Sequence, residues 1–297
     1  MTLTGTVLAA HRRHFAVALD DGARIDCVLK GRSASLACGD RVEVNRVAGG
    51  GSIERVLPRT NLIYRSDAFK EKLIAANVTQ LIGVVAPDLP VDLELVDRWS
   101  VAAEAERCTF VIIANKADLD GAQTLLERLQ PWRKLGYHVL PLSAKRDIDP
   151  LRAIVEGQHS VLVGQSGMGK STMLNALSPE VAARTAEIST ALASGRHTTT
   201  GTTLYPLDGE SMRSWIVDSP GMTAFALAHL EPHVIAEAFV EVRPCLGHCR
   251  FRDCRHDQEP GCAVQDAVER GDIAPHRVAL MHTLIADSEA ARDPARR

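Results

Sequence analysis

The sequence predicts an α/β protein of 297 residues, in which a central domain with a parallel sheet lies between a small β-barrel and a mainly helical domain. Three features of the chain lead to this prediction. Residues 1–58 contain short stretches of alternating apolar and polar residues, which are typical of strands in a small barrel. Residues 59–228 alternate apolar runs with helical patterns, as in a parallel sheet covered by helices. Residues 229–297 combine helical patterns with closely spaced Cys and His residues.

The N-terminal region is expected to form an OB-type barrel. Its alternating stretches predict strands at Thr4–Ala10, Phe15–Leu19, Arg24–Leu29, Arg41–Val47 and Ile53–Val56. Asp20-Asp21-Gly22 is a hairpin turn signal between the second and third of these strands. Five short strands favour a barrel of the kind that often binds nucleic acids.

The charge of this region differs from that of the whole chain. Up to Arg59 the sequence holds nine Lys and Arg residues against six Asp and Glu residues, whereas the formal net charge of the protein is −3. His11-Arg12-Arg13-His14 is its densest basic cluster, and Arg250, Arg252 and Arg255 form a second one near the C-terminus. The asymmetry favours a phosphate-rich partner such as RNA, and a solvated barrel surface is the alternative.

The central region has the complete alternation of strands and helices that a nucleotide-binding α/β domain needs. Apolar runs predict strands at Gln80–Val85, Thr109–Ala114, His138–Leu142, Ser160–Val163 and Ser214–Val217. Helical patterns between them predict helices near residues 91–106, 122–134, 150–156 and 171–177.

A phosphate-binding loop is the strongest single motif. The segment from Gly164 to Ser171 matches GxxxxGK[ST], and it follows an apolar strand and precedes a helical pattern. Such a loop surrounds phosphates with backbone N–H groups at a helix N-terminus, where anions are favoured. We predict that Lys170 reaches the β and γ phosphates and that the Ser171 hydroxyl binds magnesium. The expected phosphate-binding residues are Gly164, Gln165, Ser166, Gly167, Met168, Gly169, Lys170, Ser171 and Thr172.

Two further loops predict that the base is guanine. Asn115-Lys116-Ala117-Asp118 follows one buried strand, and Ser143-Ala144-Lys145 follows the next. Asp118 can accept hydrogen bonds from the ring N–H and the exocyclic amine of guanine, an arrangement that adenine lacks. Lys116 is expected to lie along the base, and Asn115 to tie its loop to the phosphate loop. Either motif alone is an ordinary polar turn, but two of them at matching strand ends make a specific signal.

The order of these motifs predicts a circularly permuted GTPase domain. The guanine motifs precede the phosphate loop, and the metal-side motif Asp218-Ser219-Pro220-Gly221 comes last. Asp218 is expected to hold magnesium through water, with the Gly221 amide near the γ-phosphate. The first switch should lie before Leu204, where either Thr198 or Thr199 is the second magnesium ligand. Both segments that flank the domain then attach beside elements that sense the γ-phosphate.

Hydrolysis needs a group that orients the attacking water, and the residue directly after the Asp-x-x-Gly motif does not supply one in this chain. Many GTPases carry glutamine directly after the Asp-x-x-Gly motif. Met222 occupies that position here, and a thioether can neither orient nor deprotonate water. Intrinsic turnover should therefore be slow. His197 is the candidate catalytic residue, because imidazole is the commonest general base near neutral pH; a solvent-facing loop histidine is the alternative.

The C-terminal region contains a predicted structural zinc site. Its ligands are spaced C-x4-C-x-H-x5-C, and they are Cys249, Cys254, His256 and Cys262. Three thiolates and one imidazole fill a tetrahedral site and leave no open position for chemistry. Disulfides are the weaker alternative, because no secretion signal precedes a chain that uses nucleotides. Cys245 and His248 lie nearby as possible alternative ligands.

All three regions resemble one family, the ribosome small-subunit-dependent GTPase A (RsgA, also called YjeQ). Besides the permuted motifs and the cysteine spacing, the likeness includes Pro58-Arg59-Thr60-Asn61, Ala75-Ala76-Asn77-Val78 and Arg196-His197-Thr198-Thr199-Thr200. The resemblance implies a factor that binds GTP, magnesium and one zinc ion. It also implies binding to the small ribosomal subunit and its rRNA, late maturation of that subunit, stimulated hydrolysis and release afterwards. Residues 277–282 depart from the pattern, because they lack the aromatic residues expected near the end of family members.

Other properties set limits on the function. The chain has no run of eighteen apolar residues and no signal peptide, so we expect a monomeric cytoplasmic protein that does not bind membranes. A metabolic P-loop enzyme is one alternative function, although the sequence shows no motif for a second substrate pocket. An RNA-binding scaffold with a vestigial GTPase is another, which Met222 permits.

Overall fold

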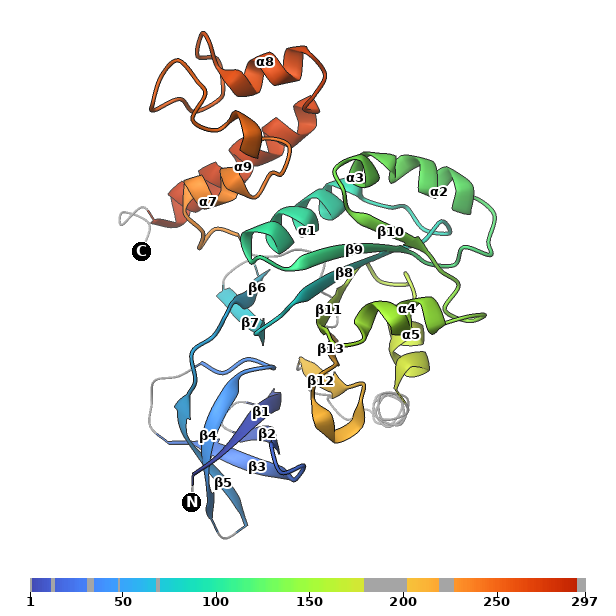
Figure 1. Ribbon diagram of the computed structural model, residues 1–297, viewed down its shortest axis with the longest axis vertical. Helices are drawn as coiled ribbons and strands as arrows, with labels where there is room; N and C mark the ends of the chain where they lie inside the picture. The colour runs from blue at the N-terminus through green and yellow to red at the C-terminus, as the bar shows by residue number, and fades with distance from the viewer. Residues whose placement is uncertain are drawn as a thin grey trace.

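The fold is described from a computed structural model, for residues 2–11, 14–30, 35–47, 49–67, 70–178, 202–218 and 227–292. The N-terminal barrel lies at one end of the molecule, the C-terminal helices lie at the other, and the α/β region lies between them (Figure 1). The described part of the chain contains no helix with the length and apolar character of a membrane span.

The N-terminal strands close into the predicted OB-type barrel. The strands are β1 (Thr2–His11), β2 (His14–Leu19), β3 (Arg24–Leu29), β4 (Arg41–Val47) and β5 (Gly50–Val56). They follow the order β1-β2-β3-β5-β4, and β4 pairs back onto β1 to close the barrel. Alternate residues fill the interior, because successive side chains of a strand point to opposite faces. Val42 and Val44 on β4 are both fully buried.

The central sheet is mainly parallel. Its strands are β8 (Gln80–Val85), β9 (Thr109–Ala114), β10 (His138–Pro141), β11 (His159–Val163), β12 (Thr203–Pro206) and β13 (Trp215–Asp218). They lie in the order β10-β9-β8-β11-β13-β12, and β12 alone among them is antiparallel to its neighbour in this sheet. A chain that began at the strand before the phosphate loop would meet β11, β12 and β13 before β8, β9 and β10. The fold is therefore the circularly permuted arrangement that the motif order predicts.

Helices cover both faces of this sheet (Figure 1). They are α1 (Leu93–Ala105), α2 (Ala122–Arg128), α3 (Gln130–Lys134), α4 (Asp149–Val155) and α5 (Lys170–Leu177). The single helix predicted over residues 122–134 is wrong in one respect, because it is divided at Leu129 into α2 and α3. Pro131 explains the division, since proline has no N–H for the helix ladder and is tolerated only in a first turn.

Two features of this region lie outside the sequence prediction. One is a two-stranded sheet of β6 (Leu62–Asp67) and β7 (Lys70–Ala76). The short strand β12 pairs with β13 on one side and with barrel strand β1 on the other, where Ala9 faces Thr203. Barrel and central strands thereby form one sheet of eleven strands.

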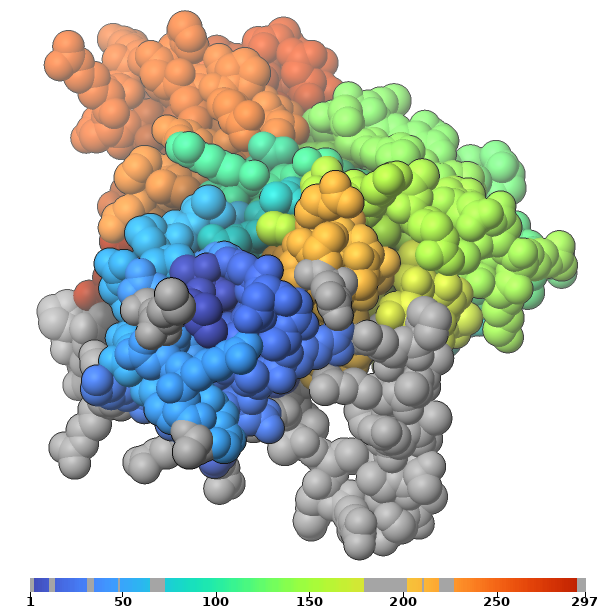
Figure 2. Space-filling view, turned by 60° about the horizontal axis from the view of Figure 1, so that its bottom comes forward, coloured from blue at the N-terminus to red at the C-terminus, as the bar shows by residue number. Residues whose placement is uncertain are grey.

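Side chains strengthen this connection between the barrel and the central sheet. The Cys38 sulfur lies 3.3 Å from the carbonyl oxygens of both Leu8 and Thr202, and its thiol can donate to either. Asn77 Nδ2 donates to the Gly39 carbonyl at 2.9 Å. Figure 2 shows the barrel, in blue, directly against the orange segment that contains β12. The barrel is thus fastened to the strand that follows the predicted first switch in the sequence.

The C-terminal region is mainly helical, as predicted. It contains α7 (Pro232–Glu237), α8 (Ala263–Glu269) and α9 (Pro275–Arg292), and α9 packs along α7. Arg277 of α9 is buried, and its guanidinium donates to Asp97 of α1 at 3.0 Å and to Glu241 at 2.5 Å. Its carbon Cζ also lies 4.7 Å from the centre of the Phe239 ring. A buried ion cluster therefore attaches α9 to α1, although residues 277–282 lack the expected aromatic side chains.

Candidate nucleotide and metal sites

The phosphate loop lies between β11 and α5, at the carboxyl edge of the parallel strands, where ligands of open α/β sheets bind. Its first helical residue is Lys170, so the unpaired N–H groups of the first turn of α5 face the loop. Gly169 precedes the helix with φ +98°, a left-handed conformation that other residues rarely adopt. A Cβ at this position would overlap the amide nitrogen of Asn115. The loop conformation and its contact with the guanine motif therefore both require glycine.

Lys170 and Asp218 form the charged pair of this site. Lys170 Nζ donates to the carbonyl oxygens of Gly164 and Gln165 at 2.5 and 2.9 Å. Burial lowers the pKa of Lys170, and the nearby Asp218 opposes that shift. Burial likewise raises the pKa of Asp218, and Lys170 opposes it. Each charge is thus held in a poorly solvated place where a phosphate or a cation would stabilise it.

Asn115 connects the loops of the base pocket. The side chain is buried, and its Nδ2 donates to the Met168 carbonyl of the phosphate loop at 2.9 Å. Its Oδ1 accepts from the backbone N–H of Ala144 at 3.2 Å. The amide therefore ties its own loop to the phosphate loop and to the Ser143-Ala144-Lys145 loop.

Asp118 is prepared to act as a hydrogen-bond acceptor. Ser143 Oγ donates to its carboxylate at 2.5 Å, and Arg146 Nε lies 3.3 Å away. The bond from Ser143 is the main cause that holds the pKa of Asp118 below its ordinary value. An ionised carboxylate at this place can accept two N–H groups of a purine edge.

These residues surround one small cavity. Its volume is about 190 Å³, and Gly169 and Thr172 of the phosphate loop and helix α5 contribute to its wall. The other lining residues come from the strand ends, and they are Asp88, Asn115, Lys116, Asp118, Leu119, Ser143, Ala144 and Lys145. The structure thus brings both predicted guanine loops and the phosphate loop to one pocket. Asp88 and Leu119 are the lining residues that no sequence motif indicated, and Asp88 is the charged one.

His197, Thr198, Thr199, Gly221 and Met222 lie outside the described residues. The two predicted magnesium ligands that are described, Ser171 and Asp218, lie at the start of α5 and the end of β13. Because β11 and β13 are parallel neighbours, both ligands lie at the same edge of the sheet.

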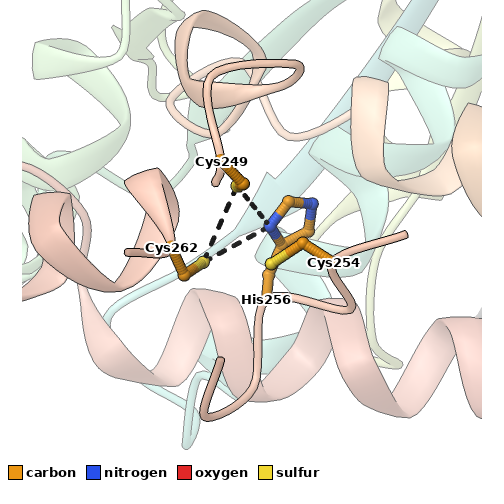
Figure 3. Close-up of side chains that lie close together, drawn as sticks. All are labelled: Cys249, Cys254, His256 and Cys262. Carbon is orange, nitrogen blue, oxygen red and sulfur yellow. Dashed lines mark hydrogen bonds between the residues drawn. The ribbon is translucent and has the colours of Figure 1, made fainter. Parts of the chain in front are cut away.

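The predicted zinc ligands converge in the C-terminal region (Figure 3). The ligand atoms of Cys249, Cys254, His256 and Cys262 all lie within 4.8 Å of one another. His256 Nδ1 is 3.4 Å from Cys249 Sγ and 3.5 Å from Cys262 Sγ, and these two sulfur atoms are 3.9 Å apart. A tetrahedron with Zn–S bonds of about 2.3 Å has edges of roughly this length. The donor set and its spacing therefore fit one zinc ion.

The surroundings prepare these side chains for a metal. Burial lowers the pKa of His256, which favours the neutral imidazole that binds metals, and burial raises the pKa of Cys254 to about 12. A cation is needed to keep such a thiol ionised. The Glu259 carboxylate accepts from the backbone N–H groups of Arg255 and Asp257, both at 2.9 Å. Glu259 therefore shapes the loop that carries His256, a role that the spacing of Cys and His residues could not reveal.

Charged residues of the barrel pair with one another. Many of its cations are paired with acids, in the pairs Lys30–Glu54, Arg41–Asp20, Arg46–Asp21, Arg55–Glu43 and Arg59–Asp40. Arg12 and Arg13 of the basic cluster lie outside the described residues. The zinc loop carries Arg250, Arg252 and Arg255 together with the exposed Phe251, and Arg250 Cζ lies 5.5 Å from the centre of the Phe251 ring.

The nucleotide site falls within a region that matches a known family. A model of the family described as RsgA GTPase matches residues 56–228. The small ribosomal subunit biogenesis GTPase RsgA of Nitrosospira multiformis is 47% identical over 99% of this chain and 93% of its own length. The protein of the same name from Nitrosomonas europaea is 48% identical over 96% of this chain and 91% of its own.

Solved structures show the same architecture. The crystal structure of YjeQ from Thermotoga maritima aligns with a TM-score of 0.74 and 30% identity, over 98% of this chain and 100% of the other. The structure of YloQ, described as a circularly permuted GTPase, aligns with a TM-score of 0.71 and 25% identity over 98% of this chain and 96% of the other. With its family match, near full-length relatives and converging site residues, the chain belongs to the RsgA GTPase family.

Proposed function

We propose that this protein is a GTPase that binds the small ribosomal subunit and its rRNA and assists the late maturation of that subunit. The subunit stimulates hydrolysis of GTP to GDP and phosphate, and hydrolysis releases the protein. The observation that carries this proposal is the joint presence of a guanine pocket and relatives of 46–48% identity that are named small ribosomal subunit biogenesis GTPases.

The base is bound at the cavity between the strand ends. Asp118 accepts from guanine, Lys116 lies along the base, and Asn115 holds the two loops in place. The contact from Ser143 supports this role, because it keeps the Asp118 carboxylate ionised and oriented. Rejection of adenine follows, since a pocket built for hydrogen bonds leaves its own groups unpaired when the wrong base enters.

The phosphates are bound by the loop from Gly164 to Ser171 and by Lys170. Magnesium is held by Ser171, by Asp218 through water, and by either Thr198 or Thr199. When bound, magnesium would supply positive charge that stabilises the negative charge developing on the phosphates in hydrolysis. The buried and oppositely charged Lys170 and Asp218 support this assignment, because both charges gain from ionic ligands.

Hydrolysis also needs a group that acts on the attacking water. We assign His197 as the residue that orients or activates the attacking water, because Met222 replaces the usual glutamine. Slow intrinsic turnover follows if docking on the subunit is needed to place His197. Both residues lie outside the described part of the chain.

The zinc ion is structural and is held by Cys249, Cys254, His256 and Cys262. The four converging ligand atoms support this assignment, and they leave no position for a reacting molecule. Cys245 and His248 are not members of that cluster, so we assign them no metal-binding role.

Contacts with rRNA come from both ends of the chain. The OB-type barrel of residues 1–58 and the zinc-binding domain of residues 229–297 flank the GTPase domain of residues 59–228. Arg12 and Arg13 in the barrel, and Arg250, Arg252 and Arg255 on the zinc loop, supply the phosphate contacts. Action on ribosomal subunits places the protein in the cytoplasm, where it acts as a monomer.

An exchange of base specificity tests the nucleotide assignment. The variant Asp118→Asn should lose at least roughly 100-fold in GDP affinity and gain affinity for xanthosine diphosphate, because an amide can donate to the added oxygen of xanthine. Asp120→Asn is the matched control, since Asp120 is an exposed neighbour outside the cavity wall. Calorimetric titration with GDP, xanthosine diphosphate and ADP gives the affinities. Equal binding of ADP and GDP by the unmodified protein would refute the guanine pocket.

A further inference from the structure

The loop between β8 and α1, residues 86–92, carries an acidic residue that belongs to none of the nucleotide motifs. This residue is Asp88, and it lines the cavity beside Asn115, Lys116 and Asp118. Its side chain is 38% exposed. An acid in a pocket for an anionic ligand needs an explanation, because it repels phosphates unless its charge is used locally.

Asp88 pairs with the lysine of the guanine motif. Lys116 Nζ donates to the Asp88 carboxylate at 2.6 Å and to the Gly167 carbonyl at 2.8 Å. One ammonium group thus joins the loop after β8, the loop after β9 and the phosphate loop. The side chain of Lys116 is 26% exposed and has a defined partner at each side. A long flexible side chain is held in one conformation as a result.

The β8 loop is itself fixed against the phosphate loop. Leu89 packs so close to Gly167 that a Cβ there would lie 2.8 Å from Leu89 Cδ1. The backbone N–H of Asp92 donates to Gln165 Oε1 at 3.4 Å. Asp92 also caps α1, since its side chain accepts from the N–H of Glu94. The carboxylate of Asp88 is therefore presented from a supported backbone.

Lys116 has an unusual backbone conformation as well. Its φ is +58°, in the left-handed region that residues other than glycine rarely adopt. Side-chain contacts at Nζ help to hold the residue in this conformation, because they are lost if the backbone rotates away. The ion pair with Asp88 thus acts on both the backbone and the side chain of Lys116.

We propose that Asp88 is a positioning residue that holds Lys116 ready to pack along the guanine base and its sugar. The inference rests on the nucleotide site proposed above and assigns a residue outside its motifs. A lysine that is already ordered loses less conformational freedom when the nucleotide binds, so affinity rises. The attraction between Asp88 and Lys116 outweighs the repulsion between Asp88 and the phosphates, because the ion pair is in direct contact.

Removal of the carboxylate tests this role. Asp88→Ala should weaken GDP binding about tenfold, as expected for one charge-assisted hydrogen bond at a partly exposed site, and Asp88→Asn should lose less. Asp120→Ala removes the same charge from a nearby exposed position outside the cavity wall and should change affinity less than about twofold. Thermal unfolding curves recorded without nucleotide should show that all three variants are folded at the temperature of the titration.

A double-mutant cycle shows whether Asp88 affects GDP affinity through Lys116 or by acting on the nucleotide directly. If Asp88 acts through Lys116, then Asp88→Ala should cause no further loss of GDP affinity in a Lys116→Ala background. A full tenfold loss in that background would overturn the proposal, because Asp88 would then act on the nucleotide itself. Unchanged or tighter GDP binding by Asp88→Ala alone would overturn it too. Failure of the unmodified protein to bind GDP would instead refute the nucleotide site.

Discussion

Single residues hold the nucleotide pocket together by linking loops that are distant in the sequence. Asn115 contacts Met168 and Ala144, and Lys116 contacts Gly167 and Asp88. The sequence motifs identified most of these residues, because the loop conformations and the recognition of the base both require particular residue types at particular spacings. Asp88 could not be identified in this way, since its partner lies on another strand end and an acid in a loop is common.

Gly169 should be sensitive to the smallest substitution. In Gly169→Ala the new methyl group overlaps the Asn115 amide, and φ +98° becomes unfavourable by about 1–2 kcal/mol. Asn115 must then leave its partners, and we expect GDP affinity to fall at least roughly 30-fold, or about 2 kcal/mol. Calorimetric titration with GDP measures the loss.

Gly136→Ala is the matched control. Gly136 also has a positive φ, +92°, but a Cβ there would have nothing within 4 Å. This variant should lose about 1 kcal/mol of folding stability and keep its GDP affinity. Equal GDP affinities of the two variants would contradict the proposed contact between the phosphate loop and Asn115.

At the scale of elements, buried parallel strands were the most predictable. The bounds of β8 and β9 are those expected from their apolar runs, because such strands are covered by helices on both faces. The division at Leu129 follows from Pro131, which the helical pattern of apolar residues does not reveal. The strand β12 was not predicted, because it is only four residues long and its partner β1 comes from the start of the chain.

The zinc loop should depend on its metal, whereas the rest of the C-terminal region should not. Arg277 holds α9 on α1 through Asp97 and Glu241, independently of the cysteine cluster. We therefore expect Cys254→Ser to lose the zinc ion and the protection of residues 249–262 against hydrogen exchange, with GDP binding unchanged. Metal analysis and hydrogen exchange measured by mass spectrometry give the two results.

Cys245→Ser serves as the control for this variant. Cys245 lies in the same region but is not a member of the four-residue cluster. It should keep one zinc ion per chain. Loss of zinc from Cys245→Ser and retention in Cys254→Ser would show that the ligand set is wrong.

At the scale of the whole molecule, both flanking regions are attached to elements of the nucleotide site. The barrel pairs with β12, and β12 follows the predicted first switch in the sequence. The C-terminal region is attached to α1, whose preceding loop contacts the phosphate loop. A partner that binds both flanking regions can therefore bias the nucleotide site between its states. Sequence motifs indicated the three regions, but these attachments depend on contacts between distant segments.

Stimulation of hydrolysis by the small ribosomal subunit tests the central claim most directly. The rate of GTP hydrolysis is measured with and without purified small subunits, with ATP and large subunits as controls. We expect a slow intrinsic rate of GTP hydrolysis and a rise of at least roughly tenfold that requires both GTP and the small subunit. The reason is that docking on the subunit places the catalytic group beside the attacking water. Tight binding to the small subunit without any stimulation would contradict the account and leave an RNA-binding scaffold as the better description.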